Sequence, residues 1–168
     1  IYNLAEAQTG KKIGSPTHTL LKNREELLLY PNDSAILEYI ALEIDTIPYS
    51  NESIPISIEF CNTSYLTISS ANCIFVDYDK IKMPLVLRKW KEGDVFYPLG
   101  MQGKKKISKY FKDEKYSLLE KQNQWILCSE NQVVWLLGKR QDNRYKITKT
   151  TRTKTYIHNF FNKIMFTN

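Results

Sequence analysis

The part of the chain that decides its fold is residues 88–113, which read RKWKEGDVFYPLGMQGKKKISKYFKD. Glycines and a proline, which mark sharp turns and close backbone approaches, are interleaved here with aromatic side chains and lysines. Lysines can neutralise phosphates, and flat aromatic rings can pack beneath them or stack. Composition alone therefore predicts a basic loop on a globular domain, of a kind that suits a nucleic-acid surface.

The charge of the chain is unevenly distributed. The net charge is +6, but residues 1–84 carry a net charge of −5 and residues 85–168 a net charge of +11. A strongly basic half makes a polyanion-binding face plausible. A merely solvated basic surface is common as well, so charge alone leaves these two interpretations equally favoured.

Length and composition set the class of protein. With 168 residues, 42% of them hydrophobic and 25% charged, the chain fits one domain of ordinary size or two small ones. It contains no apolar run near the roughly 18 residues that a membrane span needs. The start at Ile1 shows neither an initiator Met nor a signal pattern, so we expect a piece of a longer protein.

The cysteines and histidines carry no site signal. Sparse cysteines without a C-x-x-C spacing favour reduced thiols in a cytoplasmic protein over a disulfide framework or a zinc site. The isolated histidines are expected to be structural. These residues are Cys61, Cys73, Cys128, His18 and His158.

Short apolar segments at regular spacing predict a mainly β fold with a few short helices. Residues 1–14 are expected to be the end of a helix from a preceding domain and a linker, and 15–168 a single β-rich domain. Residues 34–44 fit either a helix or a strand. The expected strands are 17–22, 26–30, 54–60, 65–68, 73–76, 85–87, 125–128, 133–137, 145–149 and 153–157, and the first two are expected to form a hairpin. The expected helical turns are 117–122 and 107–111, the latter with Ile107, Tyr110 and Phe111 on one face.

A search for catalytic chemistry finds none. Residues 77–80, Asp-Tyr-Asp-Lys, hold two carboxylates but are more typical of a turn. Gly100 and Gly103 precede three lysines without the spacing of a phosphate-binding loop. Gly93 and Asp94 are predicted to form a turn in which the aspartate caps nearby amides.

The spacing of residues within and beyond 88–113 carries a resemblance to a known family. The pattern is Leu87-Arg88-x-Trp90-x-x-Gly93-Asp94-x-Phe96-x-Pro98-Leu99-Gly100-Met101-x-Gly103-x-Lys105-Lys106-Ile107-Ser108-x-x-Phe111-x-Asp113-x-Lys115, followed by Val134-Trp135, Gly138-x-Arg140-x-Asp142-x-Arg144 and Lys146-Ile147-Thr148. It resembles the C-terminal domain of the tRNA(Ile)-lysidine synthetase family. The chain departs from the family pattern at Val95, Lys109 and Ser117.

The resemblance implies a function and a fold, and it favours a strand for residues 34–44. Enzymes of this family use ATP to couple lysine to the wobble cytidine of a minor isoleucine tRNA. Their C-terminal domain contributes tRNA binding and has a layered β-sandwich fold that is also found in the β subunit of phenylalanyl-tRNA synthetase. The S-G-G-x-D-S loop of the catalytic domain does not occur here. The resemblance thus implies a non-catalytic part that holds no cofactor, with ATP and Mg²⁺ in the missing domain.

The expected partners are tRNA(Ile) and the N-terminal catalytic domain of the same chain, without a membrane. A homodimer of the full-length protein remains open. Trp90 is expected in the core, and Arg140 and Arg144 are balanced between RNA contact and an ion pair with Asp142. The alternative function is a docking module whose basic face packs on an acidic catalytic domain. The expected RNA-binding residues are Arg88, Lys89, Lys104, Lys105, Lys106, Lys109, Lys112, Arg140, Arg144 and Lys146.

Overall fold

The computed structural model describes residue 4 and residues 6–23, 26–32, 42–51, 54–61 and 70–159. The fold is mainly β with short helices, as the sequence predicted. The chain divides into two compact units, one of residues 1–39 and 111–123 and the other of residues 40–110 and 124–168. The expected boundary after residue 14 falls inside the first unit, and the expected domain division stays a prediction.

The first unit contains an antiparallel sheet of three strands, in the order β1-β2-β3. These strands are β1 (Lys12–Gly14), β2 (His18–Asn23) and β3 (Glu26–Pro31). The hairpin predicted from two apolar segments is therefore confirmed, with Leu20 opposite Leu29.

Helix α3 (Leu118–Asn123) of this unit begins at a reciprocal cap. The Glu120 amide donates to Ser117 Oγ at 3.1 Å, and the Ser117 amide donates to Glu120 Oε2 at 2.8 Å. Two amides that the helix itself leaves unpaired are satisfied in this way, which explains why the helix starts here.

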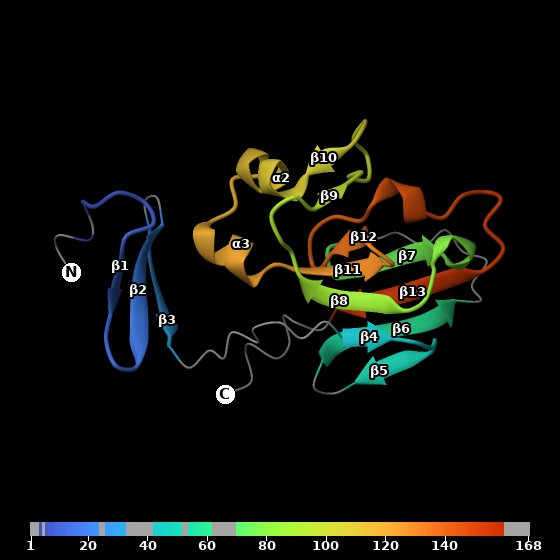
Figure 1. Ribbon diagram of the computed structural model, residues 1–168, viewed down its shortest axis with the longest axis horizontal. Helices are drawn as coiled ribbons and strands as arrows, with labels where there is room; N and C mark the ends of the chain where they lie inside the picture. Colours follow the sequence, from blue (N-terminus) through green and yellow to red (C-terminus); the bar gives the residue numbers. More distant parts are fainter. Residues whose placement is uncertain are drawn as a thin grey trace. The chain divides into compact units, whose positions relative to one another are not determined.

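The second unit contains two antiparallel sheets of four strands (Figure 1). One sheet has the order β12-β11-β8-β4 and the other the order β5-β6-β13-β7. The first comprises β4 (Leu42–Ile44), β8 (Leu85–Lys89), β11 (Trp125–Ser129) and β12 (Gln132–Leu136). The second comprises β5 (Tyr49–Asn51), β6 (Ile54–Cys61), β7 (Cys73–Asp77) and β13 (Lys154–Asn159).

One apolar core joins these two sheets into a sandwich. Leu87, Leu127 and Trp135 of the first sheet belong to the same buried cluster as Ile58 and Ile157 of the second. Alternate residues of a strand point to opposite faces, and β6, β7 and β8 each contribute every second side chain to this core. In β12, the consecutive residues Val134 and Trp135 both belong to it. The layered β-sandwich that the family resemblance implied is confirmed.

A smaller ribbon of β9 (Val95–Phe96) and β10 (Lys105–Lys106) leads directly into helix α2 (Ile107–Asp113). Ile107, Tyr110 and Phe111 are buried along one face of this helix, as their spacing predicted. The Tyr110 ring meets Phe96 edge-on at 5.2 Å. The helix is thereby fixed against the ribbon that precedes it.

Some expected elements differ from the structure. The strand predicted over 145–149 is wrong, because a 3₁₀ helix η2 (Asn143–Tyr145) is capped by the Asp142 side chain. The turn predicted at residues 77–80 is confirmed as a 3₁₀ helix η1 (Tyr78–Lys80). Residues 65–68, and 34–41 of the strand expected over 34–44, lie outside the described residues. No helix in the described parts of the chain is long and apolar enough to cross a membrane.

Candidate nucleic-acid interface

Lys104 ends the loop between β9 and β10, Lys105 and Lys106 form β10, and Lys109 lies near the start of α2. Residues 97–109 are called the lysine loop below. Gly100 and Gly103 of this loop have φ angles of +83° and +78°, which favour glycine. Lys104, Lys106 and Lys109 are exposed. Lys105 is half-buried, with its Nζ 5.7 Å from the centroid of the Tyr110 ring. The loop therefore presents several cations together on one short segment.

An ion pair between Arg88 and Asp94 fixes the segment that leads into this loop. Arg88 Nη1 and Nη2 each donate to one oxygen of the Asp94 carboxylate, both at 2.8 Å. The Lys91 amide also donates to Asp94 at 2.8 Å, so the predicted capping role of Asp94 is confirmed. Burial alone would raise the pKa of Asp94, but the hydrogen bonds from Arg88 and Lys91 outweigh it, so the pKa lies below its ordinary value.

The same turn holds the first residue of α2. The backbone carbonyl of Asp94 accepts a hydrogen bond from the Ile107 amide at 2.9 Å. Ser108 Oγ donates to the Glu92 carboxylate at 3.1 Å. Arg88 thus acts on the lysine loop indirectly, because it holds the turn to which the end of the loop is bonded.

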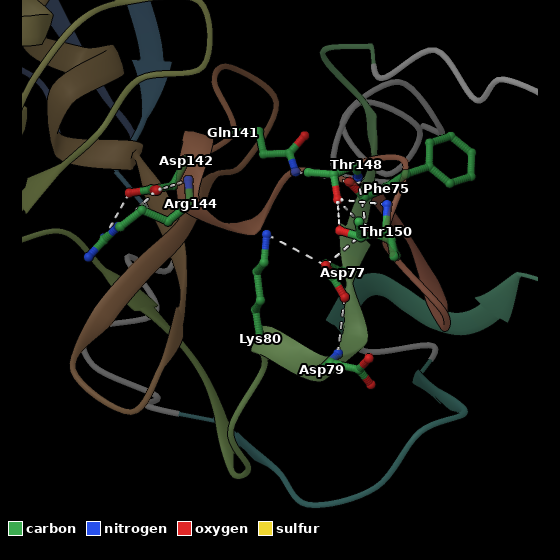
Figure 2. A network of polar contacts seen from close by, with 10 residues as sticks. Phe75, Asp77, Asp79, Lys80, Gln141, Asp142, Arg144, Thr148 and Thr150 are labelled. Carbon is green, nitrogen blue, oxygen red and sulfur yellow. Dashed lines mark hydrogen bonds and ion pairs between the residues drawn. The ribbon is translucent and has the colours of Figure 1, made fainter.

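A second ion pair, between Arg144 and Asp142, fixes the beginning of the loop (Figure 2). Arg144 Nε and Nη2 donate to the two oxygens of the fully buried Asp142 at 3.0 and 2.8 Å. The hydrogen bond to Asp142 raises the pKa of Arg144, which is a fixed cation in any case. The Arg144 guanidinium also stacks over the Tyr97 ring, 4.5 Å from its centroid.

Hydrogen bonds of backbone amides connect this second ion pair to the beginning of the loop. Asp142 accepts from the Tyr97 amide at 2.9 Å, and the Asn143 amide donates to the Tyr97 carbonyl at 2.7 Å. The Leu99 amide donates to the Gln141 carbonyl at 2.8 Å. Both ends of the lysine loop are therefore held by an arginine–aspartate pair, which limits the conformations open to the loop.

The predicted RNA-binding residues fall into two groups. Lys104, Lys106, Lys109, Lys112 and Lys146 are exposed. Half-buried residues form the other group, namely Arg88, Lys89, Lys105, Arg140 and Arg144. The ion pair of Arg88 was not predicted from the sequence. Its partner, Asp94, had been predicted only as a residue that caps nearby amides. The RNA contact of every residue in both groups stays a prediction.

Lys89 and Arg140 of the second group have well-defined surroundings. The Lys89 ammonium lies 4.6 Å from the centroid of the Trp125 ring, and burial lowers the pKa of Lys89 to about 8. Arg140 donates to the Leu99 carbonyl at 3.4 Å and to Tyr110 Oη at 3.5 Å. Arg140 is thus a further link between the lysine loop and α2, whereas Asp142 is held by Arg144.

The described residues contain no group of three or more His, Cys, Asp or Glu side chains that could hold a metal ion.

Comparison with known proteins identifies relatives for nearly the whole chain. The chain is 37% identical over 166 residues to a tRNA(Ile)-lysidine synthase from Parabacteroides distasonis, covering 95% of this chain and 36% of the relative. It is 37% identical over 155 residues to a tRNA(Ile)-lysidine synthase from Bacteroides thetaiotaomicron, covering 90% of this chain and 33% of that relative. The chain spans about a third of the length of these relatives.

Two further comparisons concern parts of the chain. Residues 1–32 match the family model described as TilS substrate binding domain. A structure described as "Crystal structure of TILS C-terminal domain" is similar with a TM-score of 0.55 and 19% identity, covering 62% of this chain and 86% of that chain. At this identity the similarity establishes the fold.

Proposed function

Because this chain belongs to the tRNA(Ile)-lysidine synthase family and corresponds to the C-terminal part of its members, we propose that it binds and orients tRNA(Ile) for such an enzyme. The complete protein would be a cytoplasmic ligase that couples lysine to the wobble cytidine of a minor isoleucine tRNA. ATP and Mg²⁺ would be held by a catalytic domain outside this chain. This chain would act without a cofactor of its own.

The lysine loop carries the proposal. Lys104, Lys106 and Lys109 are exposed on a segment whose two ends are held by the ion pairs of Arg88 and Arg144. Phosphate contacts from such lysines position an RNA without reading its sequence. In this proposal Arg88 and Arg144 support the loop, and the exposed lysines meet the phosphates.

The salt dependence of tRNA binding tests the role of the lysines. Each lost phosphate contact should reduce the slope of log K against log salt concentration by about one. We expect this change for Lys106→Ala, and about two such changes for the triple Lys104→Ala, Lys105→Ala and Lys106→Ala variant, because Lys104 and Lys106 are exposed and Lys105 is half-buried. Lys82→Ala is the matched control, because Lys82 is an exposed lysine paired with Glu130 outside this loop.

The alternative function, docking on an acidic catalytic domain, makes a different prediction. It expects the triple variant to keep its tRNA affinity and slope and to lose binding to the separately produced catalytic domain. That result would remove these lysines from the RNA site.

A further inference from the structure

The outer face of the β5-β6-β13-β7 sheet carries a row of flat rings. Tyr156 lies directly opposite Phe75, and His158 lies opposite Cys73, in the antiparallel pairing of β13 with β7. The ring centroids of Phe75 and Tyr156 are 5.0 Å apart. Those of Tyr156 and His158 are 5.9 Å apart with the planes at 25°. Side chains in directly opposed positions point to the same face of a sheet, so these three rings form one surface.

This surface is the side of the sheet that faces away from the sandwich core. Thr155 and Ile157, which alternate with the rings along β13, are fully buried. Phe75, Tyr156 and His158 are each partly exposed. The rings are therefore not needed to fill the core between the two sheets.

A basic loop adjoins one end of the ring row. In the backbone pairing of β13 with β7, Lys154 lies opposite Asp77. On the other edge of β7, Lys146 forms an isolated backbone β-bridge with Val76. Between them, Lys149 and Arg152 are exposed. The loop of residues 146–154 thus places cations beside the strand positions that carry the rings.

This loop has a defined conformation that its threonines and Asp77 maintain. Thr151 Oγ1 donates to Asp77 at 2.8 Å and accepts from the Thr148 amide at 2.9 Å. The Tyr78 amide donates to the Thr153 carbonyl at 3.0 Å. Figure 2 shows Asp77 between Lys80 and the turn at Thr148 and Thr150. A loop held in this way loses little entropy on binding.

We propose that this face binds unpaired nucleotides of an RNA, with bases stacked on Tyr156 and its neighbouring rings and phosphates over the basic loop of residues 146–154. The inference rests on the proposed function, that the chain binds RNA, and adds the structural state of the RNA that this face takes. It concerns a surface separate from the lysines of residues 104–109.

The chemistry of the face favours a single strand over a duplex. Bases in a duplex are stacked on one another and are not available to protein rings, whereas unpaired bases can be stacked on aromatic side chains beside a positively charged track. Exposed Glu59 lies opposite Tyr156 on the same face. Its carboxylate can accept a hydrogen bond from a base amino group and repels phosphates, which directs them towards the basic loop.

Fluorescence anisotropy with a labelled six-nucleotide RNA tests this inference on the 168-residue chain. A hairpin whose stem contains the same six nucleotides as one of its two strands serves as the paired competitor. We expect the single strand to bind more tightly than the stem, and Tyr156→Ala to weaken its binding by about 5- to 150-fold. Tyr156→Phe keeps the ring and should stay within about twofold of the unaltered chain.

A second variant avoids the strands altogether. Lys149→Ala with Arg152→Ala changes only exposed loop residues and should reduce the salt slope for the single strand by about 1.4. Equal binding of strand and stem, or unchanged binding by Tyr156→Ala, would overturn the inference. If the hexanucleotide does not bind while tRNA binding still responds to Lys106→Ala, the inference fails and the proposed function stands.

Discussion

Replacing Asp94 with asparagine tests whether Arg88 supports the lysine loop. The variant keeps the shape of the side chain and removes the negative charge that faces the guanidinium. The Arg88 and Asp94 side chains are only 16% and 9% exposed. Removing one partner of a buried ion pair costs about 3–5 kcal/mol. Since Arg88 keeps some contact with water, we expect the free energy of unfolding to fall by about 3 kcal/mol.

Urea unfolding followed by tryptophan fluorescence measures this loss. All three tryptophans, Trp90, Trp125 and Trp135, lie in the second unit, so the signal reports the unit that contains the ion pair. Asp79→Asn is the control, because it removes an exposed carboxylate and should change the free energy of unfolding by less than about 0.5 kcal/mol. A loss below about 1 kcal/mol for Asp94→Asn would refute the reasoning.

The pH dependence of stability gives the same test a second readout. The pKa of Asp94 is lower in the folded chain than in the unfolded one, because the bonds from Arg88 and Lys91 outweigh burial. The Asp94 carboxylate therefore makes its full contribution to the free energy of unfolding above the unfolded pKa of about 3.9. This contribution is lost as the pH falls through the lower pKa of the folded chain. The difference in stability between the unaltered chain and Asp94→Asn should be constant near neutrality and shrink below about pH 4.

Three further variants test other parts of the account. Asp142→Asn should lower the free energy of unfolding by about 2 kcal/mol in urea, less than Asp94→Asn, because Arg144 is 35% exposed. Burial lowers the pKa of Lys89 to about 8 in the folded chain, whereas an unfolded lysine titrates near 10.4, so the stability of the chain should rise with pH between these values. Lys89→Met should abolish this rise, which urea unfolding across that pH range measures. Gly103→Ala, at a φ of +78°, should cost about 1–2 kcal/mol in the same assay, and an unchanged stability would contradict the assigned loop conformation.

Much of the sandwich could be predicted from local pattern. The alternation over residues 54–60 and the apolar segments at 125–128 and 133–137 correspond to β6, β11 and β12, because a half-buried strand repeats every two residues. The helix starting at Ile107 followed from the spacing of its buried face. The pairing of β8 with β4 and β11 could not be predicted, because it depends on contacts far apart in the sequence.

The error at residues 145–149 has a local cause. Alternating apolar and cationic residues suggested a strand, but the Asp142 side chain accepts from the Arg144 amide and starts a 3₁₀ turn instead. The candidate site was predicted as a set of cations, and its division into exposed lysines and paired arginines was not. Arg88 reaches Asp94 only because the backbone turns at Gly93, which has a φ of +95°. Composition cannot tell an arginine that holds a carboxylate from one that is exposed to a ligand.

The central claim is that this chain carries an RNA-recognition surface, and its binding to a tRNA(Ile) transcript across a salt series tests that claim most directly. A DNA duplex of matched charge is the competitor. The account predicts salt-sensitive binding that the duplex displaces less effectively than unlabelled tRNA does. Equal displacement by the duplex would mean a generic basic face, and no binding at moderate salt would favour docking on a catalytic domain; either result would contradict the claim.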